Sequence, residues 1–257
     1  VMDRWVQSRL HSLIATVTEH MDAYRVTEAA RAIGSFVEEL SNWYVRRCRD
    51  RYWGSGMTPD KSAAYRTLYT VLSTMAKLTA PFVPFMAESI YQNIVRRVEP
   101  GAPESVHMCS YPVADPALID QALMEEMDFV LKVVTVGRSA RNSSGIKNRQ
   151  PLSSMLVSGS RVPSPLFREI ILEELNVKEL QSVDDASSYI AYQVKPQMRT
   201  LGPKFGKLLP KIGAHLREAD GAAIVSAMDR DGRYAFTVDG AEVVLGPDDI
   251  LVSTTQR

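Results

Sequence analysis

The chain has 257 residues, 45% of them hydrophobic and 23% charged, which excludes a disordered, collagen-like or low-complexity protein. Its 30 basic and 30 acidic residues cancel, so the overall charge favours no class of partner and only local clusters of charge can. No apolar run approaches the roughly 18 residues that span a membrane, so we expect a soluble, cytoplasmic protein with no membrane partner.

The first hundred residues have the apolar spacing of amphipathic helices. Apolar side chains recur at intervals of three and four, the spacing of one helix face, over residues 6–21, 29–44 and 64–78. A shorter fourth stretch covers 86–95. Because short connections between long helices favour antiparallel neighbours, residues 1–112 are predicted to form an antiparallel helical bundle.

Cap residues and prolines predict where these helices begin and end. Asp3 is the expected N-cap of the first helix, and the helical pattern starts so early that we expect the chain to be a piece of a longer protein. Thr58 followed by Pro59 is typical of a helix start. Pro81 is expected to end this third helix, and Pro84 to begin the fourth.

The pattern changes after the bundle. A further helical stripe over 123–134 leads toward Gly137, and residues 113–150 are predicted to be a connecting helix followed by a basic loop. Beyond Pro151 the sequence predicts short strands, helices and a hairpin, at 155–157, 167–175, 189–194, 203–216, 222–228, 234–238 and 242–245. Asp239-Gly240 is the expected hairpin turn. Residues 151–257 are therefore predicted to form a small α+β domain, in a chain that is mostly α.

No catalytic or metal site can be assembled from the residue pattern. The four histidines are scattered, and the two cysteines cannot form a disulfide framework or a four-thiolate zinc site. Residues 202–207 look like a phosphate-binding P-loop, but the loop is one residue short and Leu208 stands where the Mg²⁺-binding Ser or Thr belongs. We therefore expect no catalytic residue, no metal and no cofactor in this chain.

Three clusters of basic residues are more informative. The first cluster combines arginines with aromatic side chains and consists of Trp43, Arg46, Arg47, Arg49, Arg51 and Trp53. Arginine pairs with phosphates through its planar fork, and aromatic faces stack on unpaired bases. In the alternative interpretation, Trp43 and the neighbouring Tyr44 belong to the core, and the arginines complement the negative end of a helix dipole.

The other two clusters contain no acidic residue. The second cluster is Arg138, Arg141, Lys147 and Arg149, and the third cluster is Lys195, Arg199, Lys204, Lys207 and Lys211. In a chain of zero net charge, three such clusters could together form one face for a polyanion. The alternative is that each is an ordinary solvated surface.

Several segments resemble class I aminoacyl-tRNA synthetases for branched aliphatic amino acids. Residues 36–47 (FVEELSNWYVRR) and 78–91 (LTAPFVPFMAESIY) resemble helices of the anticodon-binding bundle of those enzymes. The remaining motifs are similar to isoleucyl-tRNA synthetases, and they are 137–141 (GRSAR), 146–152 (IKNRQPL), 174–179 (ELNVKE) and 201–207 (LGPKFGK). The resemblance covers nearly the whole chain, with the motifs in order.

The resemblance implies a C-terminal fragment of such a synthetase, from the anticodon-binding domain onward, whose partner is isoleucine tRNA. Because the HIGH and KMSKS signatures of the family are absent, the catalytic and editing domains, with the ATP and Mg²⁺ they use, are expected upstream in the same polypeptide. One branch of the family has a C-terminal zinc module built from cysteines, which the two cysteines of this chain cannot form. The resemblance is therefore to the branch without that module. The fragment alone is expected to be inactive.

All three clusters are candidate tRNA-binding residues on physical grounds, since no contact can be carried over from the zinc-bearing branch. Phosphate contacts would supply orientation and affinity, and unstacked anticodon bases would supply identity. The alternative function is a bracing arm of a valyl- or leucyl-type synthetase with little RNA affinity of its own.

Overall fold

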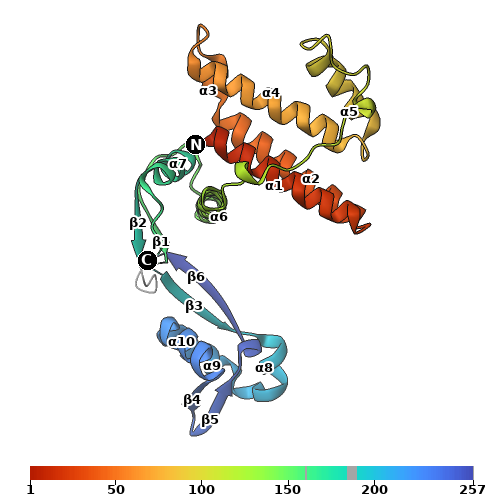
Figure 1. The fold of residues 1–257 in the computed structure, drawn as a ribbon. Helices are drawn as coiled ribbons and strands as arrows, with labels where there is room; N and C mark the ends of the chain where they lie inside the picture. Colours follow the sequence, from red (N-terminus) through yellow and green to blue (C-terminus); the bar gives the residue numbers. More distant parts are fainter. Residues whose placement is uncertain (160, 184–189, 257) are drawn as a thin grey trace. The chain divides into compact units, whose positions relative to one another are not determined.

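The first half of the chain is helical, as the apolar spacing predicts (Figure 1). The computed structural model describes residues 1–159, 161–183 and 190–256. Its long helices here are α1 (Met2–Asp22), α2 (Val26–Glu39), α4 (Pro59–Thr79), α5 (Pro84–Tyr91) and α6 (Gln121–Ser143). Shorter elements are the π-helical turns Leu40–Val45 and Gln92–Arg96, helix α3 (Arg49–Trp53), and the 3₁₀ turns Val106–Met108 and Pro116–Leu118.

The bundle is held by the predicted apolar stripes. Helix α1 packs against α2 and α4, and α4 packs against α5. Trp5, Leu10 and Ile14 of α1 are fully buried. Burying side chains of this size contributes roughly 1.5–3 kcal/mol each. Two apolar residues of the predicted stripes are not in the core: Val37, within 29–44, and Met86, the first residue of 86–95, are exposed.

The helix boundaries largely follow the predicted caps. Thr58 Oγ1 accepts a hydrogen bond of 3.1 Å from the Lys61 amide and Pro59 is the first residue of α4, so this predicted start is confirmed. Pro84 begins α5 as predicted. The prediction for Asp3 is wrong: Val1 is the N-cap of α1, and the Asp3 carboxylate lies in the first turn. Its hydrogen bonds go to other elements.

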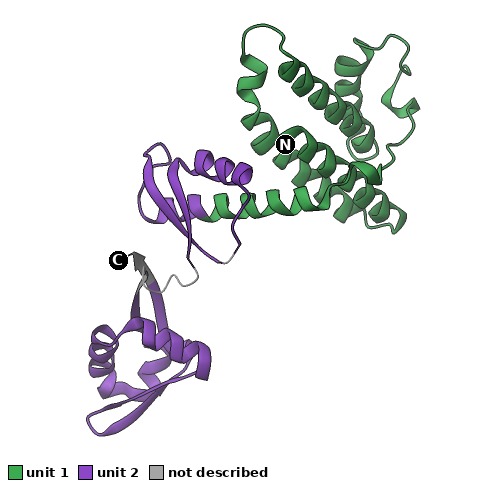
Figure 2. Ribbon diagram, turned by 60° about the vertical axis from the view of Figure 1, so that its left-hand side comes forward, with its two compact units in different colours: residues 1–136 green, residues 137–257 purple. Residues whose placement is uncertain are grey.

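Two compact units make up the chain, residues 1–136 and 137–257 (Figure 2). The boundary falls inside α6, the helix that the sequence analysis assigned to a connecting segment. The division into a bundle (1–112), a connecting helix with a basic loop (113–150) and an α+β domain (151–257) stays a prediction. Among the described residues, no helix is both long and apolar enough to cross a membrane.

The second unit begins with a strand–helix–strand arrangement. Strand β1 (Leu152–Ser158) pairs in parallel with β2 (Val177–Val183), and α7 (Pro165–Leu175) connects them. Strand β2 was not predicted. Its buried residues Val177 and Leu180 are three apart, and that spacing hides the two-residue alternation by which strands are recognised.

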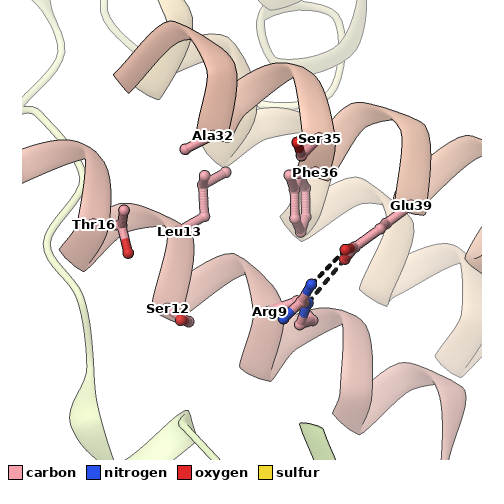
Figure 3. A pocket seen from close by; sticks show the side chains of 8 residues that line it. All are labelled: Arg9, Ser12, Leu13, Thr16, Ala32, Ser35, Phe36 and Glu39. Carbon is pink, nitrogen blue, oxygen red and sulfur yellow. Dashed lines mark hydrogen bonds and ion pairs between the residues drawn. The ribbon is translucent and has the colours of Figure 1, made fainter. Parts of the chain in front are cut away.

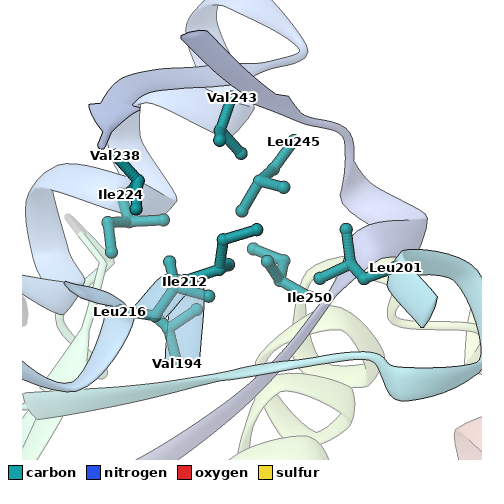
Figure 4. Close-up of a cluster of buried hydrophobic side chains, with 9 residues drawn as sticks. All are labelled: Val194, Leu201, Ile212, Leu216, Ile224, Val238, Val243, Leu245 and Ile250. Atoms are coloured by element: carbon teal, nitrogen blue, oxygen red, sulfur yellow. The ribbon is translucent and has the colours of Figure 1, made fainter. Parts of the chain in front are cut away.

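The rest of the second unit has its own core. Its elements are β3 (Ile190–Pro196), α8 (Met198–Phe205), a 3₁₀ turn (Gly206–Leu208), α9 (Leu209–Glu218), α10 (Gly221–Asp231), β4 (Tyr234–Val238), β5 (Ala241–Leu245), a second 3₁₀ turn (Pro247–Asp249) and β6 (Ile250–Gln256). Figure 4 shows the core, whose side chains point toward one another from the strands and helices: Val194, Leu201, Ile212, Leu216, Ile224, Val238, Val243, Leu245 and Ile250.

The predicted hairpin is confirmed. Strands β4 and β5 pair antiparallel. Asp239 and Gly240 between them have φ of 52° and 79°, the two positive values of the tight turn that suits the strand twist. The predicted strand 189–194 corresponds to β3, although Tyr189 lies outside the described residues.

Candidate nucleic-acid interface

The first cluster lies where α2 passes through the π-helical turn Leu40–Val45 toward α3. Tyr44 is fully buried, and its hydroxyl donates a hydrogen bond of 2.7 Å to Asp3 Oδ1, so for Tyr44 the core interpretation is correct. Trp43 is only half-buried. The guanidinium carbon of the exposed Arg46 lies 5.8 Å from the centre of the Trp43 ring, within the range of a cation–π contact.

Arg51 is used to hold the bundle together. Its two terminal nitrogens each donate a 2.8 Å hydrogen bond to the carboxylate of Asp3 in α1, and its Nε donates one of 2.8 Å to Asp60 in α4. Burial opposes ionisation of Asp3, but the hydrogen bonds from Arg51 and Tyr44 outweigh it, and the pKa of Asp3 lies below its ordinary value. With both carboxylates engaged, Arg51 connects three helices, which disfavours it as an RNA contact.

Helix α3 presents Arg49 and Trp53 at the surface. The Arg51 network attaches α3 to α1 and α4, and the Tyr52 ring packs edge-on against Tyr65 of α4 at 5.2 Å. Trp53 keeps 75% of its surface exposed, and the guanidinium carbon of the exposed Arg49 lies 5.0 Å from its ring centre. An exposed indole beside a cation suits stacking on an unpaired base. Arg47, in the same cluster, is half-buried.

In the second cluster, both helical arginines dock α6 onto α7. Arg138 Nη2 donates to Glu174 Oε2 at 2.5 Å, and the Glu174 side chain is only 3% exposed. Arg141 is 2% exposed, and its Nη1 donates to the carbonyl of Leu175 at 3.0 Å. A Cβ added at Gly137 would lie only 2.7 Å from Leu175 Cδ1, so glycine permits this close approach.

Both arginines therefore have partners inside the fold, which disfavours them as RNA contacts. A fully buried guanidinium cannot reach RNA unless it leaves its carbonyl partners, and a buried donor or acceptor that loses its partner costs about 1–3 kcal/mol. Removing Arg138 would likewise deprive the buried Glu174 of this ion pair. Both residues have a structural role. They join the segments 137–141 and 174–179, which in the sequence were connected only as motifs that resemble the same family.

The rest of the second cluster lies in the loop 144–150, after α6. Gln150 N donates to Lys147 O at 3.0 Å, so residues 147–150 form a tight turn with Asn148 and Arg149 at its corners. The side chains of Lys147 and Arg149 are exposed. As predicted, this segment is a basic loop, and its two exposed cations are available to a polyanion.

The third cluster is divided in the same way. Lys204 Nζ donates to both oxygens of Asp249, at 2.8 and 2.9 Å, and the Asp249 side chain is 4% exposed. Lys211 pairs with the half-exposed Asp239, an interaction that water and other anions can replace at little cost. The remaining members are exposed, and none of the ion pairs found among the described residues involves them: Lys195, Arg199 and Lys207.

A family model of the anticodon-binding domain of tRNA ligase matches residues 3–156, which is more than half of the chain. The chain belongs to this anticodon-binding family. The match covers the bundle, α6, the loop 144–150 and most of β1.

Curated relatives extend the match to the whole chain. It is 46% identical over 253 residues to the isoleucine–tRNA ligase of Clostridium tetani, 45% identical over 260 residues to that of Thermus thermophilus, and 42% identical over 261 residues to that of Thermobifida fusca. These alignments cover 98%, 98% and 100% of this chain, but the chain spans only about 24% of the length of each relative.

The bundle also contains a cavity of about 200 Å³ between α1 and α2 (Figure 3). Arg9 and Glu39 point toward each other at one end of it, and Arg9 Nε donates to Glu39 Oε2 at 2.8 Å. Because the charge of Arg9 is already neutralised, the cavity is not an anion site. Within the described residues, no group of three or more His, Cys, Asp and Glu side chains is arranged to hold a metal ion.

Sequence reasoning missed Asn176, which follows α7 in the left-handed conformation with φ of 51°. Its Nδ2 donates to the carbonyl of Arg149 at 3.0 Å and to that of Asn148 at 3.4 Å. The available signal was an asparagine directly after a helical apolar pattern, which is typical of a left-handed helix end. What the side chain would contact was not predictable, because the two segments are 27 residues apart.

Proposed function

We propose that this chain binds the anticodon arm of isoleucine tRNA as part of an isoleucine–tRNA ligase, the ATP-dependent enzyme that attaches isoleucine to its tRNA. The observation that carries the proposal is the match of the chain to the anticodon-binding family together with its 42–46% identity to three isoleucine–tRNA ligases. Catalysis and editing, with the ATP and Mg²⁺ they require, belong to regions of the parent polypeptide outside this chain. The chain alone is expected to be inactive, and the parent enzyme cytoplasmic.

The structural positions favour a smaller set of contact residues than charge alone does. A cation paired with a buried carboxylate or carbonyl is costly to withdraw, whereas an exposed cation can exchange partners freely. This criterion removes Arg51, Arg138, Arg141 and Lys204. The proposed contacts are the exposed cations Arg46, Arg49, Lys147, Arg149, Lys195, Arg199, Lys207 and Lys211, the aromatic residues Trp43 and Trp53, and the half-buried Arg47, which is kept for its place in the first cluster.

The proposed contacts divide the work of recognition by their chemistry. The guanidinium and ammonium groups neutralise backbone phosphates, which orients the tRNA and supplies affinity without regard to sequence. Trp43 and Trp53 each offer an aromatic face beside an arginine. Stacking of an unpaired base on such a face is worth about 1–3 kcal/mol, and the anticodon loop is where a tRNA exposes unpaired bases.

The test is the binding of this chain to an isoleucine tRNA transcript and to a copy with a changed anticodon, over a series of salt concentrations. We expect tighter binding to the cognate transcript. The log–log salt slope, at about 0.7–0.9 per neutralised phosphate, counts the cations engaged. Equal, weak binding to both transcripts would favour the bracing arm, and preference for a valine or leucine tRNA would contradict the isoleucine assignment.

A further inference from the structure

We propose that Arg141 and Asn176 are positioning residues, which hold the loop 144–150 in the shape that presents Lys147 and Arg149 to phosphates of the tRNA backbone. This inference rests on the proposed function. It assigns a role to two side chains that do not themselves touch RNA.

The end of α6 starts the loop in a defined direction. Gly145 has φ of 67°, the left-handed region that favours glycine. Gly145 N donates to Asn142 O at 3.1 Å, and Ile146 N donates to Arg141 O at 2.9 Å. These two hydrogen bonds form a Schellman motif, which ends the helix and reverses the direction of the chain. The loop therefore returns beside the Arg141 side chain.

Arg141 then holds the loop from the inside. Its Nη2 donates to the carbonyl of Lys147 at 2.7 Å and also to the carbonyl of Gln150, while its Nη1 binds Leu175 O at the end of α7. The two loop carbonyls are the first and last of the turn 147–150. One buried guanidinium thereby connects both ends of the turn to the helix pair α6–α7.

Asn176 holds the two corner residues of the same turn. Its side-chain amide donates to the carbonyls of Asn148 and Arg149, and its own carbonyl accepts from Leu152 N at 3.0 Å, at the start of β1. All four carbonyls of the turn 147–150 are therefore bound by Arg141 or Asn176.

This arrangement favours an anion on the outer face of the loop. Carbonyl oxygens carry partial negative charge and would repel a phosphate, but here they point to inner donors, while the side chains of Lys147 and Arg149 are exposed. The loop is also ordered before RNA arrives, so binding does not have to supply the free energy of ordering it.

The decisive variant is Asn176→Gly, because glycine keeps the left-handed backbone while removing the side-chain amide. Replacing Arg141 is expected to reduce folding stability, so it cannot by itself separate positioning from folding. We expect Asn176→Gly to lower affinity for the cognate tRNA about three- to tenfold at fixed salt. The salt slope should stay unchanged, since both cations are still present, and the thermal unfolding midpoint should change little.

A double-mutant cycle with Lys147→Ala/Arg149→Ala separates positioning from general structure. The Lys147→Ala/Arg149→Ala variant should lose about 0.7–0.9 of slope per charge removed. In that background Asn176→Gly should have no further effect. Removing two exposed arginines elsewhere in the same unit, Arg230 and Arg233, is the matched control and should leave tRNA affinity within twofold.

Each failure has its own signature. Wild-type affinity for Asn176→Gly, or the same loss in both backgrounds, would overturn the positioning role. Unchanged binding of Lys147→Ala/Arg149→Ala would show that the loop is not an interface, and so overturn the inference while leaving the proposed function standing. A wild-type chain that does not distinguish cognate from changed anticodon would contradict the proposed function itself.

Discussion

At the scale of single residues, burial decides what a basic side chain does. Arg49 and Arg51 are two positions apart in one short helix, yet Arg51 binds two carboxylates from other helices while Arg49 lies exposed beside Trp53. An exposed arginine can move to a phosphate. An arginine that joins α1, α3 and α4 cannot do so without loosening the bundle.

Arg49→Ala and Arg51→Ala should therefore affect different properties of the chain. We expect Arg51→Ala to lower the free energy of unfolding by about 1–3 kcal/mol, because Asp3 and Asp60 lose charged hydrogen bonds. Arg49→Ala should change stability by less than about 0.5 kcal/mol and weaken tRNA binding. Denaturant unfolding and tRNA titration of the same two variants check this, and equal effects on stability would contradict the assignment of Arg51.

A second prediction at this scale concerns Asp249 and pH. Burial opposes ionisation of Asp249, but hydrogen bonds from Lys204 and the Gly246 amide outweigh it, and its pKa lies below the ordinary value. A carboxyl whose folded pKa is depressed stabilises the fold above its unfolded pKa of about 3.9 and loses that contribution as pH falls through the folded pKa.

Asp249→Asn should consequently lower the free energy of unfolding by about 1–3 kcal/mol at pH 7. The difference from the wild type should shrink as pH falls below about 4. Unfolding measured between pH 3 and 7 tests this. Asp231, whose exposed pair with Arg230 joins adjacent residues, is the matched control, and Asp231→Asn should have little effect on stability at any of these pH values.

At the scale of elements, the helix ends direct the functional segments. Gly145 follows α6 and Asn176 follows α7, and both residues have a left-handed backbone conformation. The two helix ends meet at the loop 144–150. The motifs 137–141, 146–152 and 174–179 are thus parts of one local assembly. Their side chains hold a loop in place as much as they offer charge.

Two glycine substitutions distinguish a helix end from a helix interior. A Cβ at Gly145 or at Gly34 would meet no atom within 4 Å, but Gly145 has φ of 67° whereas Gly34 lies inside α2. Gly145→Ala should cost about 1–2 kcal/mol of stability, from the left-handed backbone alone. Gly34→Ala should raise the free energy of unfolding by about 0.5–1 kcal/mol, because alanine favours a helix interior more than glycine does. Thermal unfolding measures both, and a stabilising Gly145→Ala would contradict the helix-end geometry.

At the scale of the whole molecule, a net charge of zero means that affinity for RNA depends on where the cations lie. The proposed contacts fall in both compact units, with the first cluster in residues 1–136 and the other two in 137–257. That all three form one face stays a prediction.

Removing the exposed members of the third cluster tests its part in binding. The triple variant Lys195→Ala/Arg199→Ala/Lys207→Ala should lower the salt slope for tRNA binding by about 2–3, at 0.7–0.9 per charge. Its anticodon preference should persist, since phosphate contacts carry no sequence information. An unchanged salt slope would show that the third cluster is an ordinary solvated surface that does not contact the tRNA.

Much of the fold was predictable because its signals are local. The spacing of apolar residues predicted the helices of the bundle, Thr58-Pro59 predicted the start of α4, and Asp239-Gly240 predicted the hairpin. Strand β2 was missed because its buried residues Val177 and Leu180 are three apart, so its sequence does not alternate between apolar and polar side chains.

The sequence by itself determined the family, the mostly helical class and the positions of the basic clusters, because motifs, periodicity and charge are properties of the chain order. Only the tertiary structure decided which cations are paired with groups inside the fold. Arg51, Arg138, Arg141 and Lys204 look like their neighbours in sequence, but their partners Asp3, Glu174, Leu175 and Asp249 come from distant segments. A charge becomes structural or available through the groups that folding brings next to it, and that proximity is not encoded in any single stretch of the chain.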